Sequence, residues 1–510
     1  MKTGYHLPNI LWLCTDQQRY DTISALGNPH IQTPNIDNLV DTGVAFTHAH
    51  CQSPICTPSR ASFLTGMYPS TVHGCINGNE IWDDAAPLIT KTLADVGYDC
   101  GLVGKFHLSG AQGRIEPRVN DGYRVFDWSH HPSDDWPTSH AYAEWLKNQG
   151  HAYKDLMDRY GHIPEELHQT TWCANQTIDF ITQSRYTPWL FSFNCFDPHA
   201  PFDAPHEYVD RFDLDSLPGP IFQASDIEAQ QRLASMNFQT ESTDPASFNG
   251  KLYQAQYWAM IELIDQNVGR IMQTLDETNQ RDNTIVIFTS DHGDMTGDHG
   301  LRLKGCRFYE ALVRVPLVLS YPDQFKQGLQ SDALVELVDI VPTLLEVAGL
   351  PIPETMQGKS LLPILTGSTN GDYHRDSVRS EYYKVLSGTA SYATMIRDQR
   401  YKLINYHGHE LGGVRVSVAA KADDGVLPGG GLDGEVVLPI GEAVDEGIGA
   451  QVGEDVALAH PAPGGASAGR GDALDGAEPG PDAAEPIGAV ALGLTGHRAA
   501  AALVAERGAD

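Results

Sequence analysis

Four short apolar runs along the chain end abruptly in polar residues, a pattern that is typical of buried parallel strands. Helical patterns separate the runs, and the longest is an amphipathic stretch from Leu252 to Leu275. Strands that alternate with helices predict a doubly wound α/β sheet. Ligands of such sheets bind beyond the carboxyl ends of the strands, so we expect the polar residues to meet at one edge. The apolar runs are Asn9 to Cys14, Cys100 to Val103, Trp189 to Asn194 and Thr284 to Thr289.

Beyond about residue 370 the pattern changes to short alternating runs, which predict a small antiparallel sheet. These runs are Ser377 to Tyr383, Ser391 to Arg397 and Tyr401 to Tyr406. The expected organisation is a large α/β domain over residues 1–370, with a central, mostly parallel mixed sheet flanked by helices. The start of a smaller C-terminal sheet domain is expected over residues 371–410.

The composition changes abruptly from Leu411 to Asp510. This segment lacks Phe, Tyr, Trp, Met, Cys and Asn, whereas Gly (21) and Ala (22) fill much of it, with 16 acidic and 5 basic residues. Such a composition buries too little apolar surface to fold alone. We interpret residues 411–510 either as a disordered acidic tail or as a non-native sequence produced by a shifted reading frame.

Acidic residues outnumber basic residues by 66 to 34, which gives a formal net charge of -32 at pH 7. A field of this sign repels nucleic-acid backbones and anionic membrane surfaces, so we expect neither as a partner. An anionic substrate therefore requires a local cluster of Lys, Arg, His or metal.

The N-terminal apolar stretch from Ile10 to Cys14 is too short for a signal peptide or a membrane span. Eight cysteines are scattered without a framework spacing, which favours reduced thiols over disulfides. We therefore expect a cytoplasmic protein. The sequence leaves the oligomeric state open, a homo-oligomer included.

One segment carries a specific chemical signal, Cys56-Thr57-Pro58-Ser59-Arg60-Ala61-Ser62-Phe63-Leu64-Thr65-Gly66. It resembles the sulfatase signature C-x-P-S-R-x-x-x-L-T-G, with every fixed position present. The resemblance implies that a separate formylglycine-generating enzyme oxidises Cys56 to formylglycine, whose hydrate attacks sulfur. A helix N-terminus and Arg60 favour the alkoxide that this attack needs. The structural alternative is an ordinary loop thiol ahead of a helix.

The same resemblance implies a site for one divalent metal ion. Asp16 and Gln17 follow the first predicted strand, where sulfatases carry two acidic ligands, so Gln17 is a departure from the family pattern. Asp291 and His292 match the second pair of ligands, and the modified Cys56 completes the set. Oxygen and imidazole ligands suit calcium or manganese, and the sequence does not decide between them.

The remaining catalytic positions of the family also find matches. Lys105 and His107 stand in Gly-Lys-Phe-His-Leu, where the family has G-K-W-H-L, and are expected to bind sulfate and to take a proton from the diol. His199 stands in a D-P-H-x-P-F element and is the expected general acid for the leaving alcohol. Lys304 matches the lysine that binds the sulfate oxygens. The family also brings His73, Asn77 and Asn79 near the site.

Together these matches, which run from about residue 5 to 406, identify the chain as a relative of type I sulfatases of the alkaline-phosphatase-like superfamily. The implied reaction is hydrolysis of a sulfate monoester, with a small anionic ester as substrate. The sulfated hemiacetal then eliminates sulfate and regenerates the aldehyde. One alternative is a phosphonate monoester or phosphodiester hydrolase of the same superfamily, which often carries the Asp-Gln pattern. Another is a non-catalytic metal- or anion-binding protein in which Cys56 stays unmodified.

Overall fold

The computed structural model describes residues 7–72, 76–79, 86–111, 114–133, 139–231, 240–383, 392–407 and 416–421. An eight-stranded sheet in the order β4-β3-β5-β1-β6-β7-β2-β8 forms its centre. All its strand pairs are parallel except those that β7 makes with β6 and β2. The strands are β1 (Asn9–Thr15), β2 (Val44–His50), β3 (Asp99–Gly104), β4 (Val125–Trp128), β5 (Trp189–Asn194), β6 (Thr284–Ser290), β7 (Leu317–Ser320) and β8 (Leu329–Glu336).

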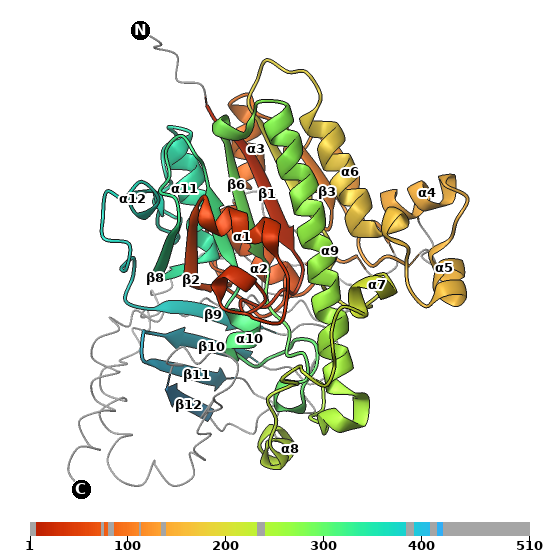
Figure 1. Cartoon of the computed structure of the whole chain (residues 1–510). Helices are drawn as coiled ribbons and strands as arrows, with labels where there is room; N and C mark the ends of the chain where they lie inside the picture. Colours follow the sequence, from red (N-terminus) through yellow and green to blue (C-terminus); the bar gives the residue numbers. More distant parts are fainter. Residues whose placement is uncertain are drawn as a thin grey trace, which may run out of the picture. The chain divides into compact units, whose positions relative to one another are not determined.

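Helices cover the sheet on both faces (Figure 1). Alternation along β1 explains this arrangement, because Ile10 and Trp12 enter one apolar cluster while Leu11 and Leu13 enter the other. The first cluster includes residues of α2, α3 and α11, and the second includes residues of α6 and α9. The helices are α1 (Pro34–Asp41), α2 (Cys56–Thr65), α3 (Ile89–Asp95), α4 (Ala141–Asn148), α5 (Tyr153–Tyr160), α6 (Gln169–Ile181), α7 (His206–Val209), α8 (Ala224–Gln230), α9 (Gly250–Glu277), α10 (Glu310–Val313), α11 (Ile340–Val347) and α12 (Leu362–Leu365).

The predicted α/β architecture is confirmed. The run from Trp189 to Asn194 is β5 without change, and the other three runs match β1, β3 and β6 to within one residue at each end. In the sheet these four strands are consecutive neighbours, in the order β3-β5-β1-β6. Their carboxyl ends therefore lie side by side, as the polar residues after them predicted.

A second sheet of four antiparallel strands follows, in the order β12-β11-β10-β9. Its strands are β9 (Val378–Tyr382), β10 (Tyr392–Arg397), β11 (Tyr401–His407) and β12 (Val416–Lys421). The first three match the predicted alternating runs. The fourth strand, β12, lies inside the segment 411–510 and pairs with β11. The small sheet therefore extends past the expected boundary at residue 410. The remainder of that segment lies outside the described residues, and its interpretation stays a prediction.

None of the helices in the described ranges combines the length and the apolar character that a membrane crossing requires. The seven cysteines that the structure describes are all free and buried. Cys75 lies outside the described residues.

Candidate active site

Four side chains with metal-ligating atoms converge at the carboxyl edge of the large sheet. They are Asp16 after β1, Cys56 at the start of α2, and Asp291 and His292 after β6, and we call them the ligand cluster. All four are buried, and one ligand atom of each lies within 4.8 Å of the others. Two carboxylates and an imidazole form a donor set that fits a hard divalent cation. The structure thus brings together four of the five predicted metal ligands, Gln17 being the fifth, whereas their role in metal binding stays a prediction.

The thiol of Cys56 marks where the oxygens of a formylglycine would stand. Lys304 Nζ lies 2.9 Å from Cys56 Sγ, and Lys105 Nζ lies 3.4 Å from it. His292 Nε2 is 3.2 Å away on the metal side. Cys56 begins the ten-residue helix α2, so the partial positive charge of the helix end faces the same point.

The electrostatic balance at Cys56 favours a negative charge. Burial and the Asp16 carboxylate act to raise the pKa of the thiol. Lys105, Lys304 and His292 outweigh both, and the pKa of Cys56 falls well below its usual value. An anionic group at this position is therefore stabilised by its surroundings.

Asp16 and Lys105 form a buried ion pair, in which the Lys105 ammonium donates to Asp16 Oδ2. Burial alone would raise the pKa of Asp16, but Lys105 and neighbouring cationic groups hold it well below its ordinary value. Burial would likewise lower the pKa of Lys105, but Asp16 and Cys56 raise it. Both residues are therefore charged at neutral pH.

The carboxylate of Asp291 accepts hydrogen bonds from several groups at this edge of the sheet. Its Oδ1 accepts hydrogen bonds from the backbone N–H groups of Gln17 (3.0 Å) and His292 (2.9 Å). Its Oδ2 accepts from Arg60 Nε at 2.8 Å, and Arg60 Nη1 donates to the carbonyl of Lys105 at 2.9 Å. The guanidinium of Arg60, expected beside the nucleophile, is thus bound to a metal-ligand carboxylate and to the Lys105 backbone. Burial and Asp16 nevertheless raise the pKa of Asp291, which is the sign of two carboxylates that share a site suited to a cation.

Two site residues other than glycine adopt left-handed backbone conformations, Gln17 with φ 71° and His107 with φ 59°. Such conformations cost free energy and persist where their surroundings impose them. Tyr257 imposes one by donating from its hydroxyl to the carbonyl of Gln17 at 2.7 Å. Glu116 imposes the other by accepting from the backbone N–H of His107 at 3.0 Å. Neither partner carries a sequence motif that could have predicted it.

Both predicted proton-transfer histidines have lowered pKa values. Burial, with help from Lys105, lowers the pKa of His107 to about 4. Burial and Lys304 lower the pKa of His199 to about 3. Nδ1 of His199 lies 2.7 Å from the carbonyl oxygen of Ala200, which only accepts, so Nδ1 carries the proton of the neutral ring. This leaves Nε2 as the atom that exchanges a proton with a substrate.

The small sheet contacts the loop that carries Lys304. The hydroxyl of Tyr406 donates to the carbonyl of Cys306 at 3.0 Å, and Lys402 Nζ donates to the carbonyl of Phe308 at 2.7 Å. Both residues come from β11, about a hundred positions further along the chain. Sequence reasoning missed these contacts because nothing in the strand pattern shows which loop the strand packs against.

Of the weaker expectations, Asn77 lies at the site, where its Oδ1 accepts from the backbone N–H of Thr57 at 3.4 Å. Asn79 pairs with Ser109 in an isolated β-bridge. His73 lies outside the described residues. The sequence also gave no reason to select His130, whose ring centroid lies 4.7 Å from that of His107.

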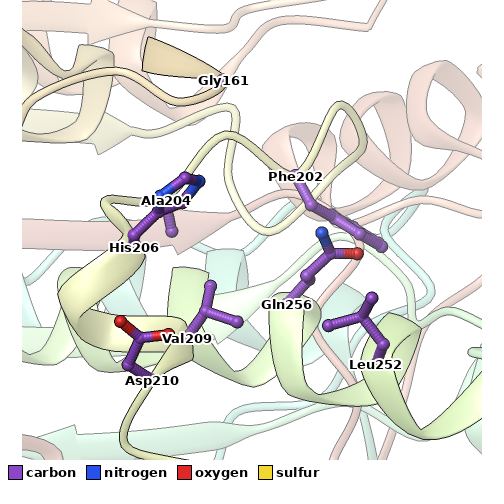
Figure 2. A pocket seen from close by; sticks show the side chains of 8 residues that line it. All are labelled: Gly161, Phe202, Ala204, His206, Val209, Asp210, Leu252 and Gln256. Atoms are coloured by element: carbon purple, nitrogen blue, oxygen red, sulfur yellow. The ribbon is translucent and has the colours of Figure 1, made fainter.

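A cavity of about 240 Å³ lies beyond the loop that carries His199. Figure 2 shows Phe202, Gln256 and Leu252 on one side of it and His206 and Asp210 on the other. None of the residues that line it belongs to the ligand cluster.

Comparison with known proteins assigns the family. Residues 8–350 match the Sulfatase family model, and residues 297–411 match the C-terminal model of N-sulphoglucosamine sulphohydrolase. The chain belongs to the sulfatase family. This confirms the resemblance seen in the sequence and places the protein among the sulfuric ester hydrolases.

Individual relatives of this sulfatase match it over most of its length. An arylsulfatase of Clostridium perfringens is 32% identical over 391 residues, which cover 72% of this chain and 80% of the relative. A choline-sulfatase of Rhizobium meliloti is 28% identical over 427 residues, or 79% of each chain. The solved phosphonate monoester hydrolase of Agrobacterium radiobacter superposes with a TM-score of 0.68 at 26% identity, covering 80% of this chain and 88% of that one. The chain therefore shares its fold with this phosphonate monoester hydrolase over most of both lengths.

Proposed function

We propose that this protein hydrolyses the sulfate monoesters of small phenols or alcohols, with Cys56 converted to formylglycine. The observation that carries the proposal is the position of Cys56 Sγ, which two lysines contact beside the ligand cluster. Names of relatives, arylsulfatase and choline-sulfatase among them, support the same substrate class. A formylglycine-generating enzyme is the partner that the proposal requires, and we retain the cytoplasm as the proposed compartment.

The proposed reaction needs two groups besides the unmodified chain, a divalent cation and the formylglycine formed from Cys56. A divalent cation, calcium or manganese, bound by the ligand cluster together with Gln17 would neutralise the ester oxygens and lower the pKa of the attacking hydroxyl. Conversion of Cys56 to formylglycine supplies that hydroxyl, because the hydrated aldehyde is a geminal diol. The donor set fits both groups, because buried carboxylates and an imidazole lie near Cys56 and two ammonium groups contact its sulfur.

The chain's own residues perform the remaining steps. Lys105 and Lys304 both contact the sulfur of Cys56, and in this proposal they bind the sulfate oxygens as fixed positive charges. Nε2 of His199 gives its proton to the departing alkoxide. The anionic ester beside the ring raises the low pKa of His199 by electrostatic attraction, which lets Nε2 hold that proton. His107 takes a proton from the second hydroxyl, and sulfate then leaves as the aldehyde re-forms.

A second candidate is hydrolysis of phosphonate monoesters or phosphodiesters. It is favoured by Gln17 beside Asp16 and by the solved phosphonate monoester hydrolases that share the fold. Lys105 and His107 favour the sulfatase, because the phosphonate branch tends to place neutral hydroxyl-bearing residues there.

The deciding experiment compares kcat/KM for an aryl sulfate and for the matching aryl phosphonate monoester. The protein is coexpressed with a formylglycine-generating enzyme and supplied with calcium or manganese. We expect a ratio well above one. A ratio well below one would show that the same residues serve hydrolysis of phosphonate monoesters instead.

The matched control is Cys56→Ala, which we expect to fold and to lack turnover on both esters. The mass of the peptide that contains Cys56 reports its oxidation to the aldehyde independently of activity. An unmodified thiol in the native host, together with retained metal, would favour a metal- or anion-binding protein over an enzyme.

A further inference from the structure

The loop from Asp197 to Asp203 follows β5 and carries His199. Its two end carboxylates are buried, with exposed fractions of 3% for Asp197 and 2% for Asp203. His199 between them is only half-buried. The backbone carbonyl of Asp197 also accepts from the backbone N–H of Asp16 at 3.1 Å, which joins this loop to the ligand cluster. The direction of the His199 ring therefore depends on what fixes the two ends of the loop.

The N-terminal end of α6 contacts both ends. His168 Nε2 lies 3.2 Å from Asp203 Oδ1, and the hydroxyl of Thr170 donates to Asp197 Oδ2. His168 Nδ1 lies 3.3 Å from the backbone N of Thr170 and 3.5 Å from Asp197 Oδ2. The ring thus accepts from Thr170 when it is neutral and faces a carboxylate on each side when it is protonated. The hydroxyl of Tyr153 donates to the second oxygen of Asp203 at 2.9 Å.

The two buried carboxylates of this cluster favour the protonated form of His168. The three ligating atoms of His168, Asp197 and Asp203 lie within 4.8 Å of one another, but both carboxylates already accept hydrogen bonds from protein donors. Burial lowers the pKa of His168, whereas the two carboxylates outweigh burial and raise it above its ordinary value. The first turn of the 13-residue helix α6 adds partial positive charge beside Asp197.

We propose that His168 is a positioning residue, which bridges the two ends of the loop from Asp197 to Asp203 and thereby fixes the direction of the His199 imidazole. The inference rests on the proposed function in one respect, namely that His199 protonates the leaving group. His168 itself touches no reacting atom. The imidazole faces the two carboxylates from two separate ring nitrogens, whereas both N–H donors of a glutamine amide sit on one nitrogen.

The test uses His168→Gln in the full chain, with His374→Gln as a matched control. His374 Nε2 also lies 3.2 Å from a buried carboxylate, Asp339 Oδ2, but outside the His199 loop. The first readout is the rate at which diethyl pyrocarbonate modifies His199, measured by peptide mass spectrometry. We expect this rate to rise several-fold in His168→Gln and to stay at the wild-type value in His374→Gln.

The second readout is kcat/KM for phenyl sulfate and nitrophenyl sulfate, since phenol is the poorer leaving group. A misdirected general acid should cost the phenyl ester about 10-fold more than the nitrophenyl ester. Equal losses for the two esters, without faster labelling of His199, would indicate a purely structural role of His168. If His168→Gln does not fold, Tyr153→Phe removes the 2.9 Å bond to Asp203 without a change of charge and is measured in the same way.

A wild-type rate of His199 modification in the folded His168→Gln protein would overturn the inference. The labelling result stands even if the wild-type enzyme hydrolyses neither ester, an outcome that would refute the proposed function alone. Faster labelling with an unchanged ratio of the two esters would keep His168 as the residue that positions the loop and would remove His199 from the acid role.

Discussion

The side-chain amide of Gln17 joins Lys304 to Asp294. Its Oε1 accepts from Lys304 Nζ at 2.8 Å, and its Nε2 donates to Asp294 Oδ2. An uncharged residue thus stands between Lys304 and Asp294, at the position where the family resemblance leads us to expect a second acid. The site consequently holds one negative charge less than the two-acid version.

This relationship predicts the effect of restoring the acid. Gln17→Asp should strengthen binding of calcium and manganese by about 10-fold, because added ligand charge raises the affinity for hard cations. Isothermal titration calorimetry measures the change, and Gln17→Asn, which has the same shape without the charge, is the control. Equal affinities for the two variants would show that residue 17 does not face the metal.

Removal of the metal should lower the thermal stability. Asp16 and Asp291 are both fully buried, so the loss of a bound cation leaves their charges without part of their compensation. We expect EDTA to lower Tm and excess calcium or manganese to restore it, since a ligand that binds only the folded state stabilises that state. Asp291→Asn should lose this response, and an unchanged Tm of the wild-type protein in EDTA would argue against a metal site here.

The acid role of His199 predicts dependence on the leaving group. His199→Ala should lower kcat/KM for phenyl sulfate by about 100-fold and affect nitrophenyl sulfate much less, because a good leaving group departs without a proton. Steady-state kinetics on the two esters provide the measurement. Equal losses would assign His199 to binding instead of proton transfer.

The contact of Tyr406 with the Lys304 loop predicts that a change in the small sheet alters stability and substrate binding. Tyr406→Phe removes a hydrogen bond to the carbonyl of Cys306, which should cost about 1 kcal/mol of stability and raise KM for the ester. Tyr208→Phe is the control, since that hydroxyl donates to Glu165 at 2.9 Å, away from the Lys304 loop. Urea unfolding and steady-state kinetics separate the two effects. A KM rise of the same size in both variants would show that the small sheet does not affect substrate binding.

Buried His50 predicts a dependence of stability on pH. Burial lowers its pKa to about 4, although Glu310, 3.5 Å away, acts to raise it. Histidine in an unfolded chain titrates near 6.5, so between these values the unfolded state binds more protons. The free energy of unfolding should therefore be full above about pH 6.5 and fall towards pH 4, with His50 contributing about 3 kcal/mol of that fall.

Urea unfolding across this pH range checks the prediction. His50→Gln should flatten the slope, because the amide takes up no proton. His151→Gln, at an exposed position, is the control. A slope that survives His50→Gln unchanged would show that other groups cause the acid sensitivity.

Much of the architecture could be predicted because it depends on local patterns. The run from Trp189 to Asn194 is mostly apolar, and it forms a strand that is buried on both faces. The helix from Gly250 to Glu277 follows the predicted amphipathic stretch with two further residues at each end. The strand at Val416 was not predicted, because the Gly- and Ala-rich composition of its segment gives no strand signal and its pairing partner, β11, lies outside that segment.

The sequence by itself determined which residues are the candidates for the chemistry. Cys56, Lys105, His199 and Lys304 stand in motifs whose spacing identifies the family, and parallel strands place the residues after them at one edge of a sheet. That much follows from the order of residues along the chain.

Only the tertiary structure decided how those residues are held. Gln17 is oriented by Tyr257 across 240 positions of sequence, and the Lys304 loop is supported by β11. Arg60 binds Asp291 and the backbone of Lys105. Such contacts join segments that are far apart in the chain, and they depend on side-chain packing and hydrogen-bond satisfaction that no local pattern encodes.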